Sequence, residues 1–323
     1  MDTRKLSMTD NAELTFQVNN EQRTLKPTKL CLEQIGGRVG IPAKYLERMR
    51  AEAPQLLAQN VNHWFSNTPE VRMLRTIQNG EMTARAFLSQ KYRPLDNFDL
   101  LNSVLPRIVE AGCEIKSCEV TEKRLYIQAV TAKIAGEIKK GDAVQAGIVI
   151  SNSEVGCGSI RIEPMIYRLV CTNGMILPTA MRKHHIGKAG DGEWDEGDAY
   201  EVFSDATRKL DDKAFWAKVN DVVTASLDSI KFAAALDRLR ATTAIDTGKP
   251  LEAVEIVANK FDMRENEKEN VLTHLASGGD LSLWGLSNSV TRAAEDCESY
   301  DRAIEMERIG GMVVELPASV FNN

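Results

Sequence analysis

Basic and aromatic side chains are the residues of this sequence whose types and spacing best suit a ligand. Arginine and lysine bind phosphate, and aromatic rings stack on bases. The middle third of the chain carries such side chains on several predicted strands and loops. The predicted nucleic-acid-binding residues are Arg75, Arg85, Lys91, Arg93, Arg124, Tyr126, Arg161, Tyr167, Arg168, Arg182 and Lys183.

The charge of the chain is spread unevenly. Residues 1–70 carry 9 basic and 8 acidic side chains, residues 71–190 carry 17 and 11, and residues 191–323 carry 14 and 27. The middle segment is therefore +6 within a chain of net charge −6. A basic segment inside an acidic chain favours a surface that faces a polyanion, but a solvated surface would have the same composition.

Patterns typical of catalysis or metal binding are weak. The six cysteines include no CxxC pair, which is typical of buried reduced thiols. His184 and His185 are adjacent, a spacing that does not chelate a metal, and "GCGSI" lacks the GxSxG pattern of a nucleophile elbow. We therefore predict no catalytic residue, no metal and no cofactor, and an enzyme with an unrecognised site stays as an alternative.

Strands and helices must position the basic residues, and short sequence patterns predict where these elements begin and end. Two hairpins are predicted, with turns at Asn19–Asn20 and Asn79–Gly80. Helices are predicted over 42–65, with a second one opening at Pro54, and over 95–112, with Asp96 or Asn97 as the cap and Gly112 as the stop. Alternating residues predict four further strands, over 113–120, 123–130, 143–151 and 159–170.

Parity sorts the side chains of these four strands onto two faces. Leu125, Ile127 and Ile148 share the predicted core face. The opposite face would carry Arg124, Tyr126, Gln128, Gln145, Gly147, Ser151, Arg161, Glu163 and Tyr167. It is either the binding face, an ordinary solvated face or a face covered by helices. Arg168 breaks the pattern, and we expect Pro164 to bulge the strand and reset the alternation.

Two loops rich in small polar residues flank the last of these strands. "SNSEVGCGS" (151–159) and "CTNGM" (171–175) offer hydroxyl, amide and backbone N–H groups. Asn and Gly also accept turn conformations that other residues resist. The loops are therefore predicted either to line a groove for a phosphodiester backbone or to form tight turns that bind nothing.

The order of the elements predicts the fold class. Strands that precede helices favour an α+β fold with an antiparallel sheet. The acid- and glycine-rich segment "GKAGDGEWDEGD" marks a boundary between a 1–190 sheet domain with a basic face and a 191–323 acidic helical region. We expect this region to end in a short strand, "GMVVEL".

Several stretches resemble a known family. "LLAQNVNHWF", "RAFLSQKYRPLDNFDLL", "GDAVQAGIVISNSEVGCGSIRIEPMIYRLVCTNGMI" and "LWGLSNSVTRAAEDCESYDRAIEMERIGG" are similar to the phage/plasmid-like protein family of unknown function, over about residues 28 to 317. Members occur in prophages, phages and conjugative plasmids. The resemblance implies a mobile-element setting and the cytoplasm of a bacterial host, in keeping with an N-terminus that has no apolar secretion signal.

Two functions follow as expectations. The first is a DNA-binding protein that binds or anneals single-stranded DNA in recombination or replication and forms a homo-oligomer along it, with no membrane partner. A sheet followed by helices is similar in outline to phage annealing proteins, which is an analogy of fold only. The alternative is a self-assembling or host-directed interaction factor without a nucleic-acid role, which would use an apolar helix face with Leu281, Leu283, Trp284, Leu286 and Val290.

Overall fold

The computed structural model describes residues 1–90, 92, 95–178 and 205–321. The described residues form an α+β fold with ten strands in two sheets, in agreement with the predicted class. They divide into two compact units. Unit 1 comprises the described parts of residues 1–94 and the loop Ser153–Gly158, and unit 2 comprises residues 95–152, 159–178 and 205–321. The predicted boundary at 190 lies outside the described residues, and the helical region shares unit 2 with the second sheet.

Unit 1 is a five-stranded sheet packed by three helices. Its elements are β1 (Leu6–Met8), β2 (Leu14–Val18), β3 (Glu21–Pro27), α1 (Lys29–Val39), α2 (Ala43–Glu52), α3 (Pro54–Asn67), β4 (Arg72–Asn79) and β5 (Glu81–Ser89). The strand order is β1-β2-β3-β5-β4, and only β3 and β5 pair in parallel. Leu14, Ile35 and Leu57 are buried between the sheet and the helices.

Both predicted hairpins are present in unit 1. Asn19 and Asn20 have φ of 51° and 66° between β2 and β3, and Gly80 has φ of 83° between β4 and β5. These left-handed conformations match the right-handed twist of the strands that they join. Helix α3 begins at Pro54 as predicted. The strand β1 was not predicted, because three residues are too few to show a period of two.

Unit 2 is built around a second five-stranded sheet. It contains α4 (Asn97–Glu110), β6 (Glu114–Val120), β7 (Leu125–Glu137), β8 (Ala143–Asn152), β9 (Arg161–Arg168) and β10 (Asn173–Ile176). The order is β10-β9-β8-β7-β6, with antiparallel neighbours throughout. The four predicted strands are confirmed. β7 extends further than predicted, past an irregularity between Thr131 and Ala135, and β10 is an additional strand.

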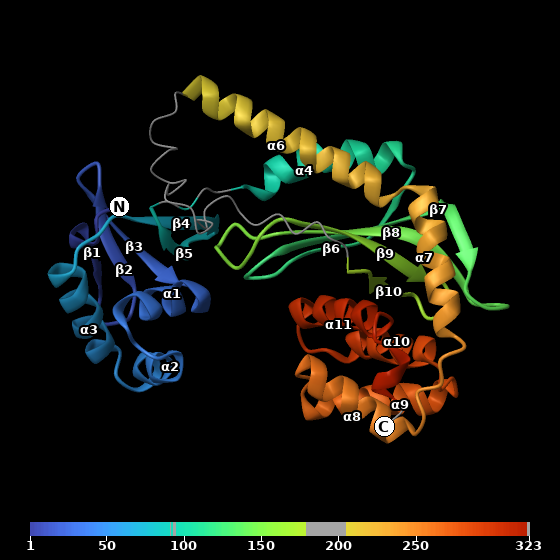
Figure 1. The fold of residues 1–323 in the computed structure, drawn as a ribbon. Coiled ribbons are helices and arrows are strands. Elements are labelled where there is room, and N and C mark those ends of the chain that lie inside the picture. Colours follow the sequence, from blue (N-terminus) through green and yellow to red (C-terminus); the bar gives the residue numbers. More distant parts are fainter. Residues whose placement is uncertain (91, 93–94, 179–204, 322–323) are drawn as a thin grey trace, which may run out of the picture. The chain divides into compact units, whose positions relative to one another are not determined.

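Helices cover both faces of the second sheet (Figure 1). Unit 2 contains α4, α6 (Asp205–Ser226), α7 (Ser229–Thr242), α8 (Pro250–Phe261), α9 (Glu265–Gly278), α10 (Leu283–Arg292) and α11 (Tyr300–Val313). Of these, α8 packs against α9, and α9 packs against α10. Leu100 of α4 and Val223 of α6 pack with Ile127 on one face. Ile304 of α11 packs with Val149 on the other. The second face was expected to be a binding face, a solvated face or a face covered by helices, and the structure shows it covered by helices.

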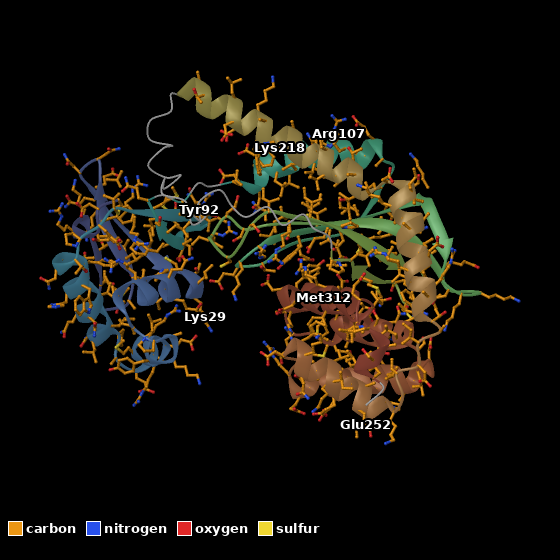
Figure 2. The ribbon with its side chains drawn as sticks, viewed as in Figure 1. Lys29, Tyr92, Arg107, Lys218, Glu252 and Met312 are labelled. Atoms are coloured by element: carbon orange, nitrogen blue, oxygen red, sulfur yellow. The ribbon has the colours of Figure 1, made fainter. Side chains whose placement is uncertain are left out.

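The predicted C-terminal strand "GMVVEL" is wrong. Helix α11 continues to Val313, and a turn follows it. Met306, Ile309 and Val313 recur at helical spacing and are buried in the core formed by α8 to α11. Outside these cores the helices carry exposed ion pairs: Arg107 with Glu110 on α4, and Glu252 of α8 with Lys249, the N-cap residue of that helix. Figure 2 labels Arg107 and Glu252.

Candidate functional site

A cavity of about 240 Å³ lies in unit 2 at one end of the second sheet. Lys139 lines it from the β7–β8 turn, Arg168 from the last position of β9, and Cys171 from the β9–β10 turn. The other walls are α9 and the face of α10 that carries Asn288 and Arg292. We call it the cationic pocket, because three of its side chains are Lys139, Arg168 and Arg292.

The β7–β8 turn is a local consequence of the sequence "KKGD". Gly141 has φ of 82°, which residues with a Cβ rarely adopt. The Asp142 N–H donates to the Lys139 carbonyl at 2.8 Å, and the Ile138 N–H donates to the Asp142 carbonyl at 3.1 Å. The turn therefore holds Lys139 at the mouth of the pocket and directs Asp142 inward.

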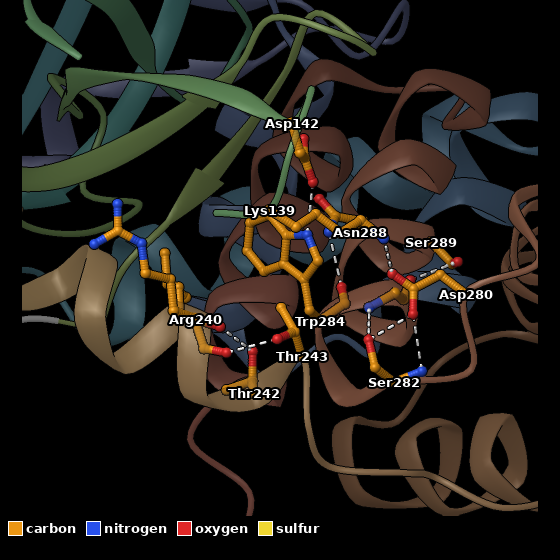
Figure 3. A network of polar contacts seen from close by, with 12 residues as sticks. Lys139, Asp142, Arg240, Thr242, Thr243, Asp280, Ser282, Trp284, Asn288 and Ser289 are labelled. Atoms are coloured by element: carbon orange, nitrogen blue, oxygen red, sulfur yellow. Dashed lines mark hydrogen bonds and ion pairs between the residues drawn. The ribbon is translucent and has the colours of Figure 1, made fainter. Parts of the chain in front are cut away.

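Asp142 fixes the position of Arg168. Its side chain is only 3% exposed. Arg168 Nε donates to its Oδ1 at 2.5 Å. Trp284 Nε1 donates to its Oδ2 at 2.8 Å (Figure 3). Arg168 Nη1 also donates to Cys171 Sγ at 3.2 Å. A carboxylate with two strong donors tolerates burial, and it leaves the guanidinium with a single orientation.

Asp280 holds a second part of the wall together. Its Oδ2 accepts from Lys139 Nζ at 2.6 Å, and its Oδ1 accepts from Ser282 Oγ at 2.6 Å. Burial alone would raise the pKa of Asp280, but the hydrogen bonds from Lys139 and Ser282 outweigh it and hold the pKa below its usual value. Ser282 is also the N-cap of α10, since its Oγ accepts from Gly285 N–H at 3.2 Å.

The pocket carries a small excess of positive charge. Three cationic side chains face one carboxylate at the wall, Asp280, and Asp142 lies buried behind Arg168. Arg292 is exposed and forms no ion pair with any residue that the structure describes. His274 also lines the pocket, where its Nε2 is 2.7 Å from Asp296 Oδ2. The arrangement suits a small anion.

The predicted binding face of the second sheet is covered by α11. Tyr126 is 4% exposed, and its hydroxyl donates to Asp301 Oδ1 at 2.7 Å. Burial, with Asp301 beside it, raises the pKa of Tyr126. Tyr167 is partly buried in the same layer, with Lys116 Nζ 5.9 Å from its ring centroid. In this conformation Tyr126 is not accessible to a base.

Further polar pairs join the same face to α11. Arg308 Nε and Nη2 donate to the two carboxylate oxygens of Glu163 at 2.8 and 2.6 Å. Gln128 Nε2 donates to Glu307 Oε2 at 2.7 Å. Burial raises the pKa of Glu307 to about 8, despite the hydrogen bonds from the Gly174 N–H and Gln128. The polar composition of this face therefore serves helix packing.

The remaining predicted residues are divided between the units. Arg75 and Arg85 lie in unit 1, where Arg85 Nη1 is 2.7 Å from Glu154 Oε2 with both side chains largely buried. Arg124 and Arg161 lie in unit 2, and Arg124 Nη1 donates to the Ser159 carbonyl at 3.3 Å. Four residues of the set lie outside the described residues, and so do the two adjacent histidines: Lys91, Arg93, Arg182, Lys183, His184 and His185.

The loop "SNSEVGCGS" packs as structure, not as a groove wall. Val155 is fully buried against Leu88, and Tyr92 Oη donates to the Ser153 carbonyl at 2.9 Å. Gly156 has φ of 79°, and a Cβ there would lie 2.7 Å from Leu88 Cδ2. Small residues are required at this loop by close packing and backbone conformation. The tight-turn alternative is therefore the one that the structure favours.

The position of Arg168 on the core face of its strand was the one feature of the sequence that indicated the pocket. The pairing of β8 with β9 continues from Ser151–Arg161 to Val144–Arg168 without a register shift, so Pro164 does not reset the alternation. Arg168 stays on the core face, and an arginine there requires a buried partner. That partner, Asp142, was missed, as were Lys139 and Arg292, because no local motif links these three residues.

The apolar helix face of the alternative function lies in the core. Leu283, Trp284, Leu286 and Val290 are buried, and Leu281 is exposed. The described residues contain no group of three or more His, Cys, Asp and Glu side chains placed to hold a metal. Of the helices in the described part, none is both long and apolar enough to cross a membrane.

Comparison with known proteins gives one match. Searches of curated proteins and of solved structures found no similar protein. The family model of a domain of unknown function, DUF932, matches residues 86–296. This match covers more than half of the chain, including the end of β5, all of α4 and the second sheet, and the helices that form the pocket. The chain therefore belongs to the DUF932 family.

Proposed function

We propose that this protein binds nucleic acid, and single-stranded DNA in particular, in the replication or recombination of a mobile element. One observation carries the proposal. Four cations lie at one end of the second sheet: Lys139 and Lys140 on the β7–β8 turn, Arg168 at the end of β9, and Arg292 at the adjacent end of α10. We call this surface the basic end. Lys139 and Arg168 pair with Asp280 and Asp142, whereas Lys140 and Arg292 form no ion pair in the described part of the chain.

Phosphate contacts suit this surface better than base stacking. Lys140 and Arg292 are exposed, and Arg168 is held in one orientation by Asp142. Beside Arg168, Leu169 and Val170 are 43% and 59% exposed. Such apolar side chains can lie against bases while the cations bind the backbone. The proposed binding surface is therefore the end of the second sheet and not the sheet face that the sequence predicted.

Salt dependence tests the proposal directly. Fluorescence anisotropy measures the affinity for a labelled single-stranded oligonucleotide. Three or four phosphate contacts predict that affinity falls roughly 20- to 50-fold between about 50 and about 200 mM salt. No binding at the lower salt concentration would end the proposal.

Two exposed cations allow a sharper test. Lys140→Gln and Arg292→Gln each remove one phosphate contact without leaving a buried charge unpaired, so each should reduce the salt slope by roughly 0.7. The matched control is Lys260→Gln, an exposed lysine on α8 outside the basic end. Slopes that change equally in all three variants would argue for general attraction and against this surface.

Self-association along DNA stays a prediction. Analytical ultracentrifugation with and without the oligonucleotide measures it, and annealing is followed with two complementary labelled strands. A monomer that binds one strand without accelerating annealing would limit the function to binding.

A further inference from the structure

The cationic pocket is large enough for a phosphate group. Its volume is about 240 Å³. A single water needs only about 10 to 15 Å³ of such space, so a phosphate and the carbons next to it fit the pocket.

The donors at the pocket suit a group that carries more than one negative charge. Arg168 uses Nε for Asp142 and Nη1 for Cys171, and its Nη2 has no hydrogen-bond partner among the described residues. Arg292 adds a cation that is not neutralised by a neighbour in the described part of the chain. A phosphomonoester carries about −1.5 to −2 at pH 7, whereas an internal phosphodiester carries one charge.

Lys139 supplies a third donor. The ammonium has three N–H groups, and the 2.6 Å contact with Asp280 uses one of them. Asp280 is held in turn by Ser282, so Lys139 can approach an anion without leaving its partner. The three cations come from three separate elements, the β7–β8 turn, the end of β9 and α10, and they meet at this cavity.

We propose that the cationic pocket binds a phosphomonoester, and that its source is the terminal phosphate of a nucleic-acid strand. Arg168 is the fixed donor, and Lys139 and Arg292 complete the contact. The choice of source rests on the function proposed above, because a free sugar phosphate has the same chemistry. The pocket would make the protein selective for strand ends.

The test compares three oligonucleotides of one sequence, with a phosphate at the 5′ end, at the 3′ end, or at neither. One additional charged contact predicts roughly tenfold tighter binding of one phosphorylated form. Arg292→Gln should abolish this preference, while Lys260→Gln should keep it. Arg292 is exposed and has no ion-pair partner among the described residues, so its replacement leaves no carboxylate of the described structure unpaired.

Competition identifies the source. Ribose 5-phosphate and inorganic phosphate are titrated against the wild type and against Arg292→Gln by calorimetry. Weaker binding of ribose 5-phosphate to the variant, with no preference among the oligonucleotides, would keep the pocket but overturn the strand end as its source. Equal affinity for all three oligonucleotides, together with no binding of ribose 5-phosphate, would overturn the inference and leave general nucleic-acid binding intact.

Discussion

Glu307 allows a direct test of the polar layer beneath α11. Its carboxylate lies between α11 and the second sheet, where it accepts from Gln128 Nε2 at 2.7 Å and from the Gly174 N–H. Burial raises its pKa from 4.5 to about 8. The perturbation is Glu307→Gln, because an amide keeps an acceptor oxygen in the same place but cannot ionise.

The sign of the effect follows from proton binding. Between about pH 4.5 and 8 the folded state keeps the Glu307 proton while the unfolded state loses it, so the wild type loses stability as the pH rises through this window. Each pH unit corresponds to about 1.4 kcal/mol, which sets a ceiling of roughly 5 kcal/mol. Glu307 is only partly buried, and solvent screening reduces this ceiling to an expected 2 to 3 kcal/mol, roughly half of it.

The assay is urea unfolding of the wild type and Glu307→Gln, followed by far-UV circular dichroism. Groups that titrate in both proteins cancel in the difference between them. We expect similar stability of the two proteins near about pH 5, and a variant more stable by about 2 to 3 kcal/mol near about pH 9. Glu298→Gln, at an exposed position just before α11, should show no such trend.

A difference between wild type and Glu307→Gln that does not change with pH would refute this reasoning. It would mean that Glu307 is solvated and that the layer beneath α11 is open to water. The predicted binding face of the second sheet would then deserve a new test with Tyr126 and Tyr167.

Three further predictions concern packing and buried charge. Gly156→Ala should lower the free energy of unfolding by about 2 to 4 kcal/mol, because the added Cβ clashes with Leu88 and the backbone keeps a positive φ. The control Gly40→Ala, with φ of 75° and no neighbouring atom within 4 Å, should lower it by about 1 kcal/mol. Equal losses in the two urea titrations would exclude the clash. Asp142→Asn should cost about 3 kcal/mol, since Arg168 loses its buried counter-charge, and a melting temperature unchanged from the wild type would contradict the pairing. Tyr126→Phe should cost about 1 to 2 kcal/mol in the same titration through the lost hydrogen bond to Asp301, and a neutral result would show that this contact is not formed in solution.

The features predicted correctly are those that neighbouring residues decide. The two hairpin turns form where Asn19, Asn20 and Gly80 accept positive φ at little cost. Pro54 opens a helix because its missing N–H is not needed in the first turn. Alternation identified the core faces of β7 to β9, since the period of a strand is two.

The candidate site required residues distant in sequence. Arg168 meets Asp142 across the sheet and Trp284 contacts the same carboxylate from α10. Sequence spacing does not encode these distances. The parity of Arg168 indicated that a partner was needed, but only the pairing of β8 with β9 identified the strand ends that supply it.

The sequence by itself determined the fold class, the family and which side chains share a face of each strand, because these depend on local periodicity and composition. Only the tertiary structure decided which faces are covered. Tyr126, Gln128 and Glu163 have the polarity of a solvated face, but α11 supplies Asp301, Glu307 and Arg308 as their partners. A polar face buried against polar groups has the same sequence pattern as one exposed to water, since both satisfy the same hydrogen bonds.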